Sequence, residues 1–152
     1  MYYVGTPSVK AKRLVQNAYD SMMAGIQAAK IGNTMGDVGY AIQHCAEKER
    51  FSVVEDFCGH GVGRAFHLLP NVLNYGRKGE GMEIVEGMIF TVEPMVNIGR
   101  PDALILSDGW TAITKDRTLS AQFEHTIGIT KDGPEIFTLS PKGLDFPPYQ
   151  LK

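Results

Sequence analysis

The sequence predicts an α+β domain in which two helices precede a mostly antiparallel sheet. Apolar residues recur at helical spacing through about the first 50 residues, and they alternate with polar residues through most of the remainder. Short turn signals separate the later segments, which is typical of neighbouring antiparallel strands. No linker, low-complexity tract or repeat divides the 152 residues. We therefore expect one domain over residues 1–152, with an extended tail over 141–152.

The amino-terminal segment MYYVG has the aromatic and β-branched composition of a strand, and we expect the chain to begin inside a larger fold. A helix should follow, because Thr6-Pro7-Ser8 offers a hydroxyl cap and a proline suited to a first helical turn. The apolar residues of this helix form a methionine-rich stripe, which we interpret as core. Gly32 and Asn33 should end the helix.

A second helix is expected after a capping box. Thr34 can cap the helix, and Asp37 takes the place of the usual glutamate three residues later. Val38 and Ile42 lie on one side of this helix, which should end near Arg50.

Alternating patterns predict strands in the rest of the chain. The segments with such patterns are FSVVEDF, EIVEGMIFTVEPMV, GWTAIT, SAQFEHTIGIT and PEIFTLS. The stretch HLLPNVLNYGRKGEG is expected to be a long loop, because it contains Pro70 and several glycines.

Composition and charge exclude several classes of function. The formal net charge is -2 and basic residues are scattered, so neither nucleic acid nor an anionic membrane is an expected partner. The two cysteines form no CxxC pair, so we expect free thiols and no disulfide framework. The sequence shows no basic leader with an apolar segment and no run of transmembrane length. We expect a cytoplasmic protein.

The stretch FCGHGVGRAFH places His60 and His67 around three glycines. Glycine is costly in ordered structure, so either another group approaches the main chain closely or the chain adopts positive φ. A binding site and a tight structural turn are both consistent with this pattern. A phosphate-binding loop is excluded, because GHGVGR lacks the lysine and the Ser/Thr that such a loop requires.

Two glutamates stand in otherwise apolar strands, Glu93 in FTVEPM and Glu124 in SAQFEHT. A buried carboxylate must be paired, protonated or bound to a metal, because an isolated buried charge is very costly. Alternation places Glu124 and His125 on opposite faces of their strand. One imidazole, from His60, and the two carboxylates form a plausible ligand set for a divalent transition metal. Salt-bridged or edge-strand glutamates and a hydrogen-bonded histidine are the alternative.

The remaining candidates are weaker. We interpret His44, on the polar side of a helix, and His125 as structural residues. Cys58 shares a face with His60 if the segment is extended, so a thiolate ligand is conceivable. No second cysteine is nearby to support it.

Several long motifs in the same order resemble the second half of type I methionine aminopeptidase. They are FCGHGVGRAFH, FTVEPM, DGWT, TKDRTLSAQFEHTI and EIFTLS, and the resemblance runs from about Met1 to about Ser140. It implies half of the pita-bread fold that this family shares with prolidases and creatinase.

The resemblance also implies a two-metal site. His60, Glu93 and Glu124 match its metal ligands, with Glu124 bridging the two ions and Glu93 also handling the proton of the bridging water. Cobalt, manganese, iron and zinc all suit such ligands.

Substrate contacts follow from the same resemblance. His67 matches the histidine that contacts the substrate amide and its tetrahedral intermediate. Phe66 and Trp110 match walls of the pocket for the methionine side chain. The implied substrate is the amino terminus of a peptide or nascent protein.

The match lacks two aspartate ligands that precede this region in the family. We therefore expect metal-dependent removal of N-terminal methionine that requires the missing half. The alternatives are a non-catalytic fragment that serves as a binding or assembly module, and an inactive truncated product. The expected protein partner is a complementary N-terminal half or a second copy of the chain.

Overall fold

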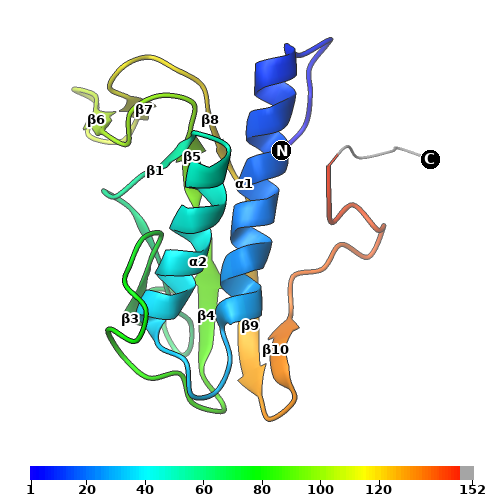
Figure 1. Cartoon of the computed structure of the whole chain (residues 1–152), viewed down its shortest axis with the longest axis vertical. Coiled ribbons are helices and arrows are strands. Elements are labelled where there is room, and N and C mark those ends of the chain that lie inside the picture. Colours follow the sequence, from blue (N-terminus) through cyan, green and yellow to red (C-terminus); the bar gives the residue numbers. More distant parts are fainter. Residues whose placement is uncertain (148–152) are drawn as a thin grey trace.

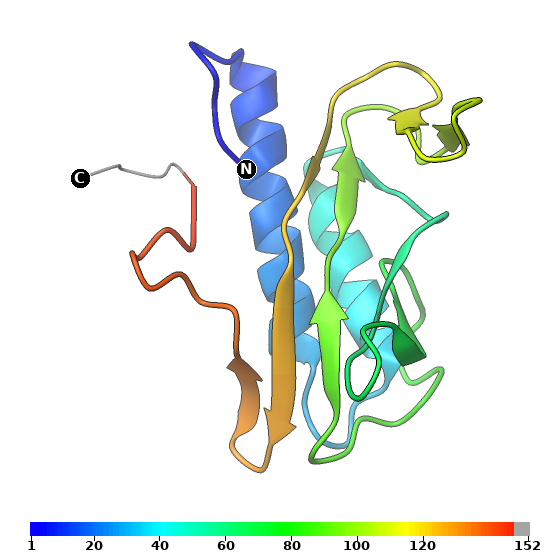
Figure 2. The same ribbon diagram turned by 180° about the vertical axis from the view of Figure 1, so that it is seen from behind.

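The computed structural model describes residues 1–147, which form a layer of two helices against a layer of antiparallel strands (Figures 1 and 2). Helix α1 (Val9–Ala28) and helix α2 (Met35–Lys48) pack against each other. Both lie on the same side of the strands, which Figure 2 shows from behind. The predicted α+β class is confirmed. Neither helix in the described part is long and apolar enough to cross a bilayer.

Both helices begin where the sequence predicts. The Ser8 side chain accepts a hydrogen bond from the Ala11 amide and caps α1. The capping box of α2 is complete, because Thr34 accepts from the Asp37 amide while the Asp37 carboxylate accepts from the Thr34 amide. Helix α1 ends at Ala28, one turn before the expected glycine.

Five strands form the central sheet in the order β10-β9-β4-β2-β3, and all neighbours are antiparallel. In chain order they are β2 (Cys58–Gly61), β3 (Leu68–Leu73), β4 (Ile89–Val92), β9 (His125–Thr130) and β10 (Gly133–Ile136). A second antiparallel sheet has the order β1-β5-β8 and contains β1 (Ser52–Val53), β5 (Met95–Asn97) and β8 (Ser120–Gln122). A two-stranded hairpin contains β6 (Ala103–Ile105) and β7 (Ala112–Thr114).

The core lies between the helices and the sheets. Met22 of α1 and Ile42 of α2 are buried in one apolar cluster with Phe90 and Val92 of β4. Because side chains alternate along a strand, Thr91 and Glu93 point away from this cluster. The packing of β4 on the helices thus directs Glu93 to the opposite face of the sheet.

Two local expectations are wrong. In the described part of the chain, residues 1–7 form no strand, and the side chain of Val4 is 99% exposed. Strand propensity needs a partner strand, and β10 and β3 form the edges of the central sheet without this segment. The predicted loop after His67 contains strand β3. Pro70 is tolerated there because β3 is an edge strand.

Other segments are more divided than expected. FSVVEDF contributes only the short β1, and SAQFEHTIGIT divides into β8 and β9 at Phe123 and Glu124. Strand β6 lies in a segment for which no strand was predicted. Of the expected extended tail, residues 141–147 form turns in which the Asp145 carboxylate accepts from the Ser140 amide. Residues 148–152 lie outside the described part.

Candidate active site

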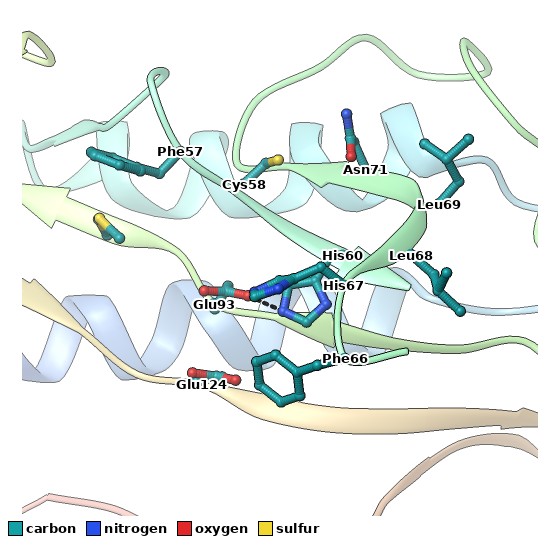
Figure 3. A pocket seen from close by; sticks show the side chains of 11 residues that line it. Phe57, Cys58, His60, Phe66, His67, Leu68, Leu69, Asn71, Glu93 and Glu124 are labelled. Carbon is teal, nitrogen blue, oxygen red and sulfur yellow. Dashed lines mark ion pairs between the residues drawn. The ribbon is translucent and has the colours of Figure 1, made fainter. Parts of the chain in front are cut away.

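An open hollow of about 730 Å³ lies on the sheet face opposite the helices (Figure 3). It contains both histidines of the glycine-rich stretch and both strand glutamates. The lining residues are Phe57, Cys58, His60, Phe66, His67, Leu68, Leu69, Asn71, Glu93, Met95 and Glu124. His60 and Glu124 are 64 positions apart in sequence, and both line the hollow because β2, β4 and β9 are neighbours in the sheet.

Close packing of strands explains the glycines beside His60. A Cβ atom at Gly59 would lie 2.4 Å from the Thr91 carbonyl oxygen, and one at Gly61 would lie 2.2 Å from the Leu69 carbonyl oxygen. Neither glycine has a positive φ. Of the two explanations that the sequence left open, close approach of another main chain is therefore the one that applies.

His60 faces the carboxylate of Glu93. Its Nδ1 lies 3.0 Å from the Gly61 carbonyl oxygen, which can only accept, so Nδ1 carries a hydrogen. In the neutral imidazole, Nε2 then keeps its lone pair and lies 3.5 Å from Glu93 Oε1. The side chains of His60 and Glu93 are only 12% and 16% exposed. An imidazole oriented in this way by a carbonyl is the common arrangement of a metal-binding histidine.

The two glutamates approach the hollow from separate strands. Glu93 immediately follows β4, and Glu124 lies between β8 and β9. Glu124 is exposed, but partial desolvation in the hollow raises its pKa, the negative charge of Glu93 raises it further, and His60 opposes this shift. Such coupling indicates that the three groups share one electrostatic environment.

His67 and Phe66 form one wall of the hollow. The ring centroid of His67 lies 4.3 Å from that of His60 and 4.6 Å from that of Phe66, with the rings edge to face in both pairs. Figure 3 shows His67 beside His60, with the Phe66 ring beside Glu124. The predicted substrate-contacting pair therefore adjoins the predicted ligands.

Trp110 lies outside the hollow. It follows the turn between β6 and β7, its side chain is 87% exposed, and it is not among the residues that line the hollow. Its assignment to a methionine pocket stays a prediction from the resemblance, which this arrangement of the described residues does not support.

The other histidines and Cys58 lie as expected. His125 is buried and its Nδ1 lies 2.8 Å from the Thr138 hydroxyl, while His44 stacks on Tyr40. Cys58 lines the hollow on the same side of β2 as His60. Burial raises the pKa of the Cys58 thiol, and the charge of Glu93 raises it further, so the thiolate form is disfavoured.

The donor set fits a divalent cation. Two carboxylates face the hollow, and no lysine or arginine is among the described residues that line it, so a bound cation would offset their repulsion. One neutral imidazole and two carboxylates are ligands that zinc and its neighbours accept. Within residues 1–147, no three His, Cys, Asp or Glu side chains are placed closely enough to enclose an ion. Binding would therefore require side-chain movements.

Two polar residues that the sequence analysis did not single out contact Glu93. The Thr91 hydroxyl donates to Glu93 Oε1 at 2.7 Å, and Gln122 Nε2 lies 3.4 Å from Glu93 Oε2. Alternation along the strands places Thr91 on the face of Glu93 and Gln122 on the face of Glu124, but neither position in the sequence indicates a contact with Glu93.

The chain is similar in sequence to known metallopeptidases. Residues 1–131 match the sequence profile of metallopeptidase family M24. The chain is 61% identical to the methionine aminopeptidase of Rickettsia prowazekii, over 98% of the chain and 58% of that relative. It is 45% identical to the methionine aminopeptidase of Escherichia coli, over 91% of the chain and 53% of that relative. The chain thus spans little more than half the length of the curated relatives it matches.

Solved structures show the same likeness. The crystal structure of methionine aminopeptidase from R. prowazekii superimposes with a TM-score of 0.89 and 59% identity, over 91% of this chain and 56% of that one. The enzyme from Thermotoga maritima gives a TM-score of 0.88 and 42% identity, over 90% and 55% of the two chains. Prolidase from Pyrococcus furiosus, at 21% identity and a TM-score of 0.67, shares the fold over 90% of this chain and 35% of its own. The pita-bread half-fold is confirmed, and the chain belongs to metallopeptidase family M24.

Proposed function

We propose that this chain forms part of a metal-dependent aminopeptidase that removes N-terminal methionine from peptides and nascent proteins. The single observation that carries the proposal is the convergence of His60, Glu93, Glu124 and His67 on one hollow. Identity of 61% to a methionine aminopeptidase supports the choice of substrate. A non-catalytic binding module has no evident need for this set of side chains.

The ligands proposed for the cation are Nε2 of His60 and the carboxylates of Glu93 and Glu124. When bound, a divalent cation acidifies a coordinated water and polarises the substrate carbonyl. The ligand types suit cobalt, manganese, iron and zinc alike.

The chain's own residues supply the remaining chemistry. Glu93 is held by Thr91 and is in reach of His60, so it is placed to accept the proton that the attacking water gives up. His67 can donate a hydrogen bond to the carbonyl oxygen of the scissile bond as negative charge develops there. Phe66, packed on His67, offers an apolar wall for the methionine side chain.

The proposed activity belongs to this chain together with the portion that its relatives have and that it does not match. Three candidate ligands can hold one ion, whereas the resemblance implies a pair of ions with two further aspartates. We also propose a cytoplasmic location, which the free thiols of Cys45 and Cys58 favour.

Reconstitution tests the proposal. The chain is mixed with a polypeptide that spans the unmatched portion of the R. prowazekii relative, and release of free methionine from Met-Ala-Ser is followed with and without Mn²⁺. Methionine release should require both polypeptides and the cation, and EDTA should abolish it. Glu93→Gln should abolish it too, because the amide keeps the shape but cannot accept the proton. Glu135→Gln, the same change on an exposed residue of β10, should have no effect. If the two polypeptides bind each other and Mn²⁺ but release no methionine, the proposal is wrong.

A further inference from the structure

We propose that Thr91 is a positioning residue, whose hydroxyl links the main chain of His60 to the carboxylate of Glu93 and so fixes two candidate ligands from different strands relative to each other. The inference rests on the proposed function for the identity of these ligands. It concerns the geometry of the site before any substrate binds.

The hydrogen bonds of Thr91 define this link. The hydroxyl oxygen accepts from the His60 amide at 2.9 Å and lies 2.7 Å from Glu93 Oε1. It also lies 3.4 Å from the His60 carbonyl oxygen. A hydroxyl has one proton, and the shorter contact, to a charged acceptor, is the stronger one. The His60 amide therefore donates to the Thr91 hydroxyl oxygen, and the Thr91 hydroxyl donates to the Glu93 carboxylate.

The hydroxyl takes the place of a main-chain hydrogen bond at this point of the sheet. Strands β2 and β4 are paired in register only at Gly61 and Phe90. One residue earlier on β2, the amide of His60 is met by the Thr91 side chain instead of a carbonyl. The absence of a side chain at Gly59 lets β4 come close enough, since a Cβ there would lie 3.1 Å from the Thr91 hydroxyl oxygen.

Burial makes this link rigid. Thr91 is 1% exposed, so water cannot replace its partners. Breaking the link would leave buried polar groups without partners, which is costly. Gln122 supports the other carboxylate oxygen of Glu93, but from a longer distance of 3.4 Å. Both donors are neutral, so they orient the carboxylate and leave its negative charge for a cation.

Zinc binding by three variants of the whole chain tests the inference. Thr91→Val replaces the hydroxyl with a methyl group of similar size, Thr91→Ala removes it without adding bulk, and Thr91→Ser keeps it. Titration calorimetry should show about tenfold weaker zinc binding for the valine and alanine variants, in the range found for groups that orient metal ligands. Thr91→Ser should bind zinc nearly as wild type does.

A matched control removes a hydroxyl elsewhere on the same sheet. Thr130 donates to the Gly133 carbonyl oxygen at 2.8 Å in the β9–β10 hairpin and does not line the hollow. Thr130→Val should leave zinc affinity unchanged. Amide hydrogen exchange gives a second readout, because the His60 amide should exchange faster in Thr91→Val and Thr91→Ala than in Thr91→Ser.

The outcomes separate the inference from the proposed function. The inference is overturned if Thr91→Val and Thr91→Ala both bind zinc as tightly as wild type does. It is also overturned if Thr91→Ser loses as much zinc affinity as these two variants, or if the wild-type chain binds no zinc. If zinc affinity changes as expected but the reconstituted protein releases no methionine, the proposed function fails and the role of Thr91 in positioning stands.

Discussion

Gly59→Ala should damage the fold and the site together, because strand β4 passes directly over this glycine. The added Cβ would lie 2.4 Å from the Thr91 carbonyl oxygen, where an ordinary contact begins at 3.4 Å. The strands would have to separate by about 1 Å, the difference between these two distances. The same movement would stretch the bond from the His60 amide to the Thr91 hydroxyl, now 2.9 Å, beyond hydrogen-bonding range.

The expected cost has two parts. Overpacking at a site that cannot relax costs about 1–3 kcal/mol, and a lost buried hydrogen bond adds about 1 kcal/mol. Urea unfolding followed by circular dichroism should therefore show a loss of about 2–4 kcal/mol in the free energy of unfolding.

Gly63→Ala is the matched control from the same stretch. A Cβ there would meet only Leu68 Cδ1 at 3.0 Å, the end of an exposed and flexible side chain. It should change stability by about 0.5 kcal/mol or less. The reasoning fails if Gly59→Ala is as stable as wild type, or if both alanine variants lose the same free energy.

Four further changes probe the core, the capping box and the site charges. Phe90→Ala should lower the free energy of unfolding by about 3–5 kcal/mol in urea titrations, because Phe90 is 0% exposed; a loss below 1 kcal/mol would mean that the core collapses around the cavity. Thr34→Ala should cost about 1 kcal/mol through loss of the helix cap. Its partner Asp37 has a pKa lowered chiefly by the hydrogen bond from the Thr34 amide, so the Asp37 carboxylate stabilises the fold at neutral pH and loses this effect as the pH falls below about 4. Asp37→Asn should remove this pH dependence from the urea midpoints. If the pH dependence persists in the variant, Asp37 is not its source. The pKa of Glu124 is raised in the folded chain, so its ionised form opposes folding above that pKa. Glu124→Gln should therefore stabilise the metal-free chain at pH 7, by less than about 1 kcal/mol for this exposed side chain, and should have no such effect at low pH. A variant less stable than wild type at pH 7 would contradict this sign.

Much of the fold could be predicted because local signals and packing agree. The capping box of Thr34 and Asp37 and the apolar stripe of α1 need only their own segments to be recognised. Strand β3 could not be recognised in this way. Pro70 signals a loop locally, and only the position of β3 at the sheet edge makes a proline acceptable. The segment MYYVG fails for the converse reason, since its propensity has no strand to pair with.

The candidate site was predictable in its charged members and not in its supporting ones. A carboxylate between apolar residues, such as Glu93, indicates a paired, protonated or metal-bound group, because an isolated buried charge is costly. Thr91 in the same segment gives no such indication, because threonine is an ordinary strand residue and its role depends on the His60 amide, 31 residues earlier in the chain. The role of Trp110 stays a prediction from the resemblance, because the loop between β6 and β7 places it outside the residues that line the hollow.

Anomalous diffraction from crystals of the chain soaked in zinc would show directly whether His60, Glu93 and Glu124 bind a cation together. Data collected on both sides of the zinc absorption edge locate the ion independently of any assumption about its ligands. We expect a peak in the hollow, with His60 Nε2 and the carboxylates of Glu93 and Glu124 at about 2.0–2.2 Å from it. A fully occupied zinc elsewhere on the chain, with none at these three side chains, would contradict it.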